Sequence, residues 1–185
     1  LNAGTLSHIY GSVDGVAPAG VIFTETTEGP LVQTSFEARV GMSDAGEVTY
    51  SASGSGGPDG LFDSAWVNTN ALAVEGEPLT TGPLAGLYWS FASAPQMTAN
   101  GIPYFSGGTR TSVGGSTSAH GLWAGYTETP YYYTGDELFG LPAPIDNSAA
   151  IDFSYKVSRF GTLVLLSITM ETTGTGVPST QDTAM

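Results

Sequence analysis

No cysteine occurs in the sequence, and only four residues are basic: Arg39, Arg110, Lys156 and Arg159. Without thiols, a disulfide framework, a zinc–thiolate site and a cysteine nucleophile are excluded. The 17 acidic residues give a formal net charge of −13, which repels phosphate backbones and anionic lipid. We therefore expect no nucleic-acid partner.

Long apolar runs and helical periodicity are also missing. The longest apolar run, residues 163–168, is far shorter than the roughly 20 residues that cross a bilayer, so we expect no membrane span. Gly or Pro interrupts every stretch with helical spacing of apolar residues. The 26 glycines and the many Thr, Ser and Tyr residues favour short strands joined by tight turns, and predict an all-β fold.

The sequence begins at Leu1 without a basic segment followed by an apolar one, and we interpret the chain as a processed product. Its composition is acidic, poor in Lys, rich in Thr and Gly, and free of thiols. Such a composition is typical of exported surface proteins, so we expect an extracellular or cell-surface location.

One phrase of ten residues organises the chain: a hydrophobe, a turn containing glycine, then a strand. It occupies residues 97–106, is preceded by a similar phrase at 42–51, and is followed by one at 157–167 with one residue inserted. The phrase glycines Gly46, Gly101 and Gly161 stand 55 and 60 residues apart. This spacing predicts tandem β-repeats.

The predicted domain covers residues 1–170, with three repeats of about 60 residues at approximately 1–60, 61–121 and 122–170. The later two repeats open on a similar pair, Leu61-Phe62 and Leu122-Trp123, and continue with a hairpin and a turn that joins Gly to an acid. Residues 171–185 are rich in Thr and Gly, with scarcely a hydrophobe, and predict a flexible tail.

This order of motifs resembles the bacterial secreted tandem-repeat proteins with a choice of C-terminal anchor, whose repeats carry Asn-x-x-Gly followed by an aromatic residue. Residues 121–125 and 134–137 are the closest local matches, and the resemblance covers about residues 13–168. It implies propeller-like β blades and no assigned reaction. The chain departs from the family where the signature Asn is replaced by a hydroxyl residue, at Ser43, Thr98 and Ser158. No anchor segment is visible in the sequence either.

Three repeats are too few to close a propeller, which usually has about four to eight blades. We therefore expect that the chain is a fragment of a longer repeat protein, that the units stack openly as an antiparallel sandwich or solenoid, or that copies of the chain complete one another. Open arrays leave edge strands that pair with other chains. The predicted assembly strand, which has neither proline nor charge, contains Leu163, Val164, Leu165, Leu166 and Ile168; the strand at 1–10 is the alternative crossing element.

Three acids recur once per repeat beside Gly or just before Pro: Asp14, Glu77 and Asp136. A catalytic carboxylate has no reason to appear three times at equivalent turns, whereas an acceptor for turn N–H groups does. Weak calcium binding is the alternative, although no EF-hand ligand spacing occurs. We predict no cofactor and no metal site.

Catalytic motifs are not evident. The sequence has no Gly-x-Ser-x-Gly elbow and no phosphate-binding glycine motif, and His120 falls in a polar loop. A glycoside hydrolase would need two carboxylates flanking one bond, and Glu75, Glu77, Asp136 and Glu137 are available for it. Availability alone is not evidence, and we predict that the protein is not an enzyme.

Aromatic residues are the better candidates for binding. In a strand, Tyr132 faces away from Tyr131 and Tyr133, so one of the two faces can be exposed. Tyr132, Trp89 and Trp123 are candidate platforms for stacking on a sugar, with core packing as the alternative for the two Trp residues. The leading hypothesis is a self-assembling structural β-repeat protein of a surface layer, fibre or matrix; the alternative is a carbohydrate-binding module with glycans as partners.

Overall fold

The structure is a computed structural model that describes residues 22–26, 29–55, 62–68, 70–137, 144–146, 154–169 and 183–184. Within these ranges the chain forms strands, one 3-10 turn, η1 (Gly82–Leu84), and no α-helix. This confirms the all-β class. The strands are β1 (Ile22–Thr26), β2 (Gly29–Met42), β3 (Val48–Ser55), β4 (Phe62–Val67), β5 (Asn70–Val74), β6 (Tyr88–Met97), β7 (Pro103–Arg110), β8 (Ala119–Ala124), β9 (Pro130–Tyr133), β10 (Ser154–Val157), β11 (Val164–Thr169) and β12 (Thr183–Ala184).

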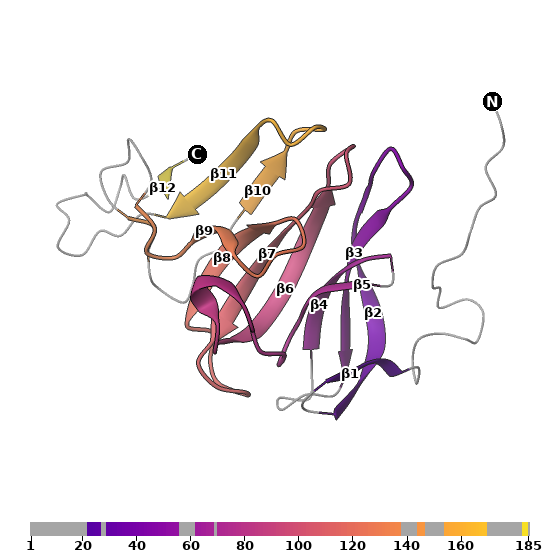
Figure 1. The fold of residues 1–185 in the computed structure, drawn as a ribbon, viewed down its shortest axis with the longest axis vertical. Helices are drawn as coiled ribbons and strands as arrows, with labels where there is room; N and C mark the ends of the chain where they lie inside the picture. Colours follow the sequence, from indigo (N-terminus) through magenta and orange to yellow (C-terminus); the bar gives the residue numbers. More distant parts are fainter. Residues whose placement is uncertain are drawn as a thin grey trace.

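The strands form three antiparallel sheets, and none of the sheets closes into a barrel (Figure 1). The first sheet has the order β1-β2-β3-β4-β5, the second β6-β7-β8-β9, and the third β10-β11-β12. Within each sheet, every strand pairs with the next one in the sequence, and most of the loops between paired strands are short.

The second sheet is the middle layer, because both of its faces are covered. β6 contacts β2, β3 and β4 of the first sheet. On β7, Phe105 lies in the core shared with the first sheet, whereas its neighbour Tyr104 lies in the core shared with the third. Trp123 and Leu122 of β8 divide between the two cores in the same way. This alternation is the period of two that a strand imposes on its side chains.

A third cluster lies on the other face of the first sheet. On β4, Ala65 packs toward the second sheet, whereas Trp66 points away and packs with Tyr50, Ala52 and Val74. Trp66 is 4% exposed. The first sheet therefore also carries apolar side chains on both faces.

The sheet boundaries do not coincide with the predicted repeat boundaries. The first sheet ends at Val74 and the second begins at Tyr88, so the unit predicted at 61–121 supplies β4 and β5 to one sheet and β6 and β7 to the next. Each copy of the repeated phrase, in contrast, stays within one sheet and connects β2 to β3, β6 to β7, or β10 to β11.

Two predicted segments lie largely outside the described residues. The strand predicted at 1–10 and the acid Asp14 are among residues that the structure does not describe. Of the tail predicted as flexible at 171–185, only β12 is described, and it pairs with Ile168 and Thr169 of β11. Over the ranges that the structure covers, no helix is long and apolar enough to cross a membrane.

Gly41 is a sensitive test of how the first two sheets pack. A Cβ atom at this position would lie 2.5 Å from the backbone nitrogen of Met97 and 2.9 Å from its Cβ. Since backbone cannot rotate away, Gly41→Ala should lower the free energy of unfolding by about 1 to 3 kcal/mol. Urea denaturation measures this change. An unchanged midpoint would show that β6 does not lie against β2 at this point.

Candidate functional site

The three phrase turns have the same hydrogen bonds. In each, the hydroxyl residue three places before the phrase glycine accepts, through its side-chain oxygen, the backbone N–H of the residue that leads into the next strand. The phrase glycine has a positive φ, between 72° and 85°, as tight turns require. The hydroxyl bonds run from Glu47 N–H to Ser43 Oγ (3.1 Å), from Ile102 N–H to Thr98 Oγ1 (2.9 Å) and from Leu163 N–H to Ser158 Oγ (3.0 Å).

The three turns also lie side by side, and their backbones are joined (Figure 1). The Asp44 N–H donates to the Ala99 carbonyl at 2.9 Å, and the Ala99 N–H donates to the Arg159 carbonyl at 2.6 Å. These three residues occupy the same place in their turns, directly after the hydroxyl residue. We call this arrangement the turn row.

Side chains reinforce the turn row. The Arg159 guanidinium reaches past Ala99 to the Asp44 carboxylate, with Nη2 at 2.9 and 3.0 Å from its two oxygens. It also lies over the ring of Phe160. Because Arg159 and Asp44 are both well exposed, water screens this ion pair and its contribution to stability is small.

Glycine is needed in the turn row for space as well as for its φ. A Cβ atom on Gly101 would collide with the Glu47 carboxylate of the first turn. A Cβ atom on Gly161 would lie 3.3 Å from Cγ2 of Thr98 in the second turn. Gly101 and Gly161 therefore each lie against the preceding turn, whereas a Cβ atom on Gly46, in the first turn, would meet nothing within 4 Å.

The two predicted Trp platforms lie in the core. Trp89 is 3% exposed and Trp123 is fully buried, with ring centroids 4.8 Å apart. Phe105 stacks on Trp123 at 5.8 Å. The core-packing alternative describes both residues, and neither ring is available at the surface to stack on a sugar.

The alternation predicted for the three consecutive tyrosines is wrong at Tyr131. Leu122 pairs with Tyr132 but Trp123 pairs with Pro130, so Tyr131 is the extra residue of a β-bulge. Its ring therefore lies beside that of Tyr132, at 4.7 Å, instead of facing away. Tyr132 is half-buried against the third sheet, and Tyr131 is the more exposed ring.

Two of the three predicted turn acids are described. The Asp136 carboxylate accepts the Tyr133 N–H at 2.7 Å, the turn role predicted for it. The backbone carbonyls of Glu77 and Asp136 resemble one another in their bonding. The Glu77 carbonyl accepts the Trp89 N–H, and the Asp136 carbonyl accepts the Ile145 N–H. In the described part of the chain, no three His, Cys, Asp or Glu side chains gather to hold a metal ion.

Sequence reasoning missed a buried ion pair. Arg110, at the end of β7, is 2% exposed, and its Nη1 lies 3.2 Å from Oε1 of Glu75. Oε2 of Glu75 accepts the Asp63 N–H at 3.1 Å. Glu75 thus connects the first sheet to the second. The only sequence signal was that Arg110 is one of four basic residues.

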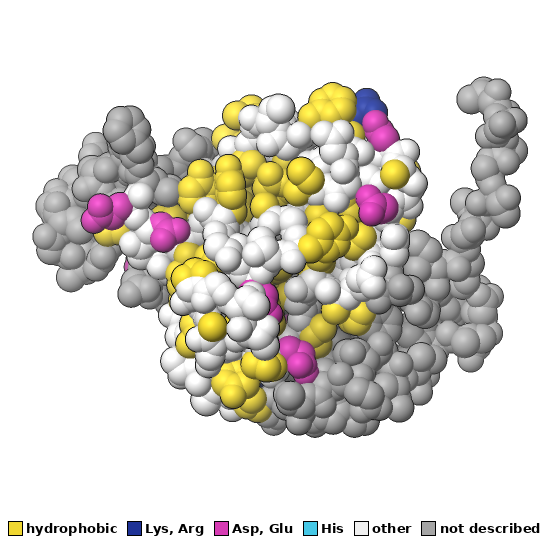
Figure 2. Space-filling view, in the orientation of Figure 1, with side chains coloured by type: hydrophobic (Ala, Val, Ile, Leu, Met, Phe, Trp, Pro, Cys, Tyr) yellow, Lys and Arg dark blue, Asp and Glu magenta, His cyan; other side chains and the backbone are white. Residues whose placement is uncertain are grey.

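The predicted assembly strand is β11 with the residue that precedes it. Leu163 and Leu165 are 68% and 53% exposed, whereas Val164 and Leu166 pack into the core of the second and third sheets. Ile168 pairs with Ala184 of β12, directly after the residues of β11 that pair with β10. In Figure 2, hydrophobic side chains reach the surface as a band over the region of β9 to β11.

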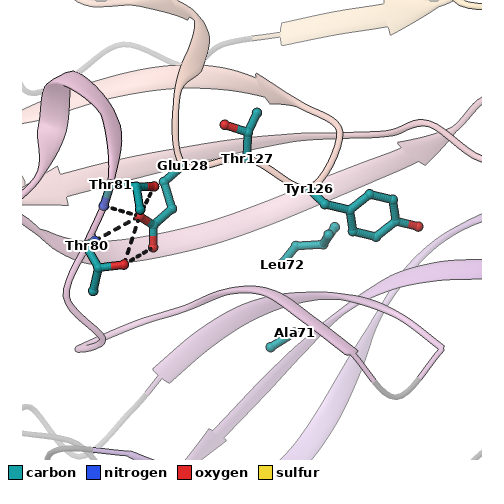
Figure 3. Close-up of a pocket in the computed structure, with 7 residues that line it drawn as sticks. All are labelled: Ala71, Leu72, Thr80, Thr81, Tyr126, Thr127 and Glu128. Atoms are coloured by element: carbon teal, nitrogen blue, oxygen red, sulfur yellow. Dashed lines mark hydrogen bonds between the residues drawn. The ribbon is translucent and has the colours of Figure 1, made fainter.

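A surface pocket of about 400 Å³ lies between the end of the first sheet and the loop after β8 (Figure 3). The Glu128 carboxylate points at Thr80 and Thr81 and accepts both backbone N–H groups, at 2.8 and 2.6 Å, and the Thr81 hydroxyl at 2.7 Å. Tyr126 is 61% exposed. The remaining lining residues are Ala71, Leu72 and Thr127.

Hydrogen bonding controls the charge of this pocket. Partial burial raises the pKa of Glu128, but the hydrogen bonds from Thr81 and Thr80 together lower it more. The pKa of this carboxyl group is therefore below its ordinary value, and the group stays ionised to a lower pH. Burial, and then the negative charge of Glu47, raise the pKa of Tyr126, so its phenol stays neutral. The carboxylate is thus occupied in tying the loop after β8 to the segment after β5.

Comparison with protein-family models, with curated proteins and with solved structures finds no match. The fold therefore defines a class only, an all-β chain of open antiparallel sheets. The resemblance to choice-of-anchor repeat proteins stays a prediction.

Thr98 tests the role of the turn hydroxyl. Thr98→Val keeps the shape of a fully buried side chain but removes the acceptor of the Ile102 N–H, and should lower the free energy of unfolding by about 1 to 3 kcal/mol. Thr98→Ser retains the hydroxyl and should lose less. Thermal and urea unfolding compare the three proteins. Equal stability of Thr98→Val and the wild type would contradict the role.

Proposed function

We propose that the protein is an extracellular, non-enzymatic β-repeat protein that associates with copies of itself in a surface layer, fibre or matrix. The turn row carries this proposal. Hydrogen bonds at equivalent positions join each turn to the next, and nothing in that geometry limits the row to three members. The acidic, thiol-free composition supports a location outside the cell.

A repeat origin for the sheets is supported by their strand register. Tyr50 pairs with Trp66 and Phe105 pairs with Trp123, and Tyr50 and Phe105 each follow their phrase glycine by four residues. In this register, Trp66 of the first sheet corresponds to Trp123 of the second sheet. The sequence comparison of Leu61-Phe62 with Leu122-Trp123 instead placed Phe62 opposite Trp123. β4 and β8 each have a register shift next to the aligned Trp.

The hydrogen bonds that close these sheets also correspond. The Asp63 N–H donates to the Glu75 carboxylate, and the Glu75 N–H donates to the Asp63 carbonyl. In the same way, the His120 N–H donates to the Thr134 hydroxyl, and the Thr134 N–H donates to the His120 carbonyl. We therefore interpret 29–74 and 88–133 as two blade-like repeats, with 154–169 as the first two strands of a third. Three such units cannot close a propeller alone, which favours completion by other copies.

Self-association should be visible without any ligand. In light scattering after size exclusion, the wild-type chain should have a mass that is a multiple of the single chain and rises with concentration. Negative-stain microscopy should show discrete rings or filaments. A monomer at every concentration reached would overturn the proposal.

Carbohydrate binding is the second candidate, and the pocket of Figure 3 favours it. Pockets of this size hold small ligands, and an exposed aromatic ring such as that of Tyr126 can stack on a sugar. Tyr132, the platform predicted from the sequence, is half-buried and presents less of its ring.

A glycan array tests this candidate. Tyr126→Ala should abolish binding of any glycan that the wild type retains, because the stacking surface is lost, whereas Tyr126→Phe should keep it. Circular dichroism confirms that both variants fold. If the wild type binds no glycan, or if Tyr126→Ala binds equally well, the candidate fails.

A further inference from the structure

We propose that copies of the chain associate head to tail, with the outer face of the third sheet of one copy docked on the outer face of the first sheet of the next, at the end where the turns lie. This inference rests on the proposed self-association and specifies its interface. The first-sheet patch consists of Val40 and Met42, and the third-sheet patch of Lys156, Leu163 and Leu165.

The residues of the first-sheet patch are exposed, whereas the equivalent residues of the third sheet are covered by the second sheet. In the pairing of β2 with β3, Val40 and Met42 occupy the places that Tyr155 and Val157 have in the pairing of β10 with β11. Tyr155 and Val157 pack against the second sheet. Val40 and Met42, in contrast, are 65% and 68% exposed.

The third-sheet patch shows the converse. Leu165 pairs with Lys156 as Tyr104 pairs with Gln96 in the second sheet. Tyr104 is 6% exposed, and its carbonyl accepts the Tyr155 hydroxyl of the third sheet at 2.9 Å. Leu165 is 53% exposed, because no fourth sheet follows among the described residues.

The polar groups of the two patches also match. Gln96 donates its side-chain N–H to the Tyr155 carbonyl at 2.9 Å and accepts the Val157 N–H at 3.1 Å, which joins β6 to β10. In the third sheet, the position equivalent to Gln96 is held by Lys156, which is exposed. Its expected acceptor on the next copy is the Val40 carbonyl, which is equivalent to that of Tyr155. A cation there also suits docking onto a chain with a net charge of −13.

The turn row supplies the backbone contact. Ala99 uses both its N–H and its carbonyl within the row. Among the described residues, the Arg159 N–H has no acceptor and the Asp44 carbonyl has no donor. Docking the third turn of one copy beside the first turn of the next would join these two groups and continue the row without a break.

Such an interface is heterologous, since different surfaces of the same chain meet. Repeated contacts of this kind generate a closed ring if the rotation between copies closes, and a filament if it does not. The occupant of each patch is therefore the opposite patch of a second copy.

Complementary blocked variants test this arrangement. Met42→Asp buries a charge in the first-sheet patch and Leu165→Asp does so in the third-sheet patch, so each variant alone should associate roughly tenfold or more weakly than the wild type. Both side chains are exposed, so folding should be retained. An equimolar mixture should give a heterodimer and nothing larger, because one intact patch remains on each partner. Val113→Asp, at an exposed hydrophobe in the loop after β7, is the matched control and should associate like the wild type.

The outcomes separate the two proposals. A wild-type chain that never associates overturns both. Two results would overturn only the head-to-tail interface, provided that the wild-type chain associates. One is that either single variant still assembles fully, and the other is that the mixture of the two variants stays monomeric.

Disulfide trapping provides a second measurement that does not depend on introduced charge. The chain has no cysteine, so Met42→Cys and Leu165→Cys each add a single thiol. Oxidation of an equimolar mixture should yield the mixed dimer far above the statistical level, which is about twice the amount of either homodimer. A mixed dimer at or below that statistical level would overturn the proposed interface.

Discussion

The fold depends on the burial of the second sheet on both faces. Its strands alternate side chains between two cores, so Phe105 and Trp123 hold it to the first sheet while Tyr104 and Leu122 hold it to the third. A single antiparallel sheet with one solvent-exposed face could not bury the side chains of both faces. Burial of apolar side chains is the main stabilising force available to a chain without disulfides. The outer sheets are positioned by this middle layer, and the turn row follows from their alignment.

The sequence was informative where the chemistry is local. A hydroxyl residue three places before a glycine specifies a turn, and all three predicted turns form with that hydroxyl bonded to the backbone. The all-β class also followed from composition. Other features depend on strand register, which the period of two cannot reveal. A bulge places Tyr131 beside Tyr132. Tyr50, four residues after its phrase glycine, pairs with Trp66, as Phe105 pairs with Trp123 at the same distance from its own.

Candidate sites were harder to predict because burial decides what a side chain can do. Trp89 and Trp123 have the residue type of a sugar platform, but they lie in a core. Glu75 appeared among the acids available for hydrolysis, yet its carboxylate lies against Arg110 and the Asp63 N–H. Because charged side chains usually lie at the surface of a protein, the buried Glu–Arg pair between the sheets could not be predicted from the sequence.

Almost every strand pairs with its neighbour in sequence, and this has a consequence for how the chain acquires its structure. Each hairpin can form from a short segment, before later residues are available, so little loop-closure entropy opposes its formation. Among the strands that the structure describes, the pairing of β12 with β11 is the one that joins distant residues within a sheet. Under the proposed repeat organisation, the gain or loss of a whole unit would leave each remaining turn beside an equivalent neighbour.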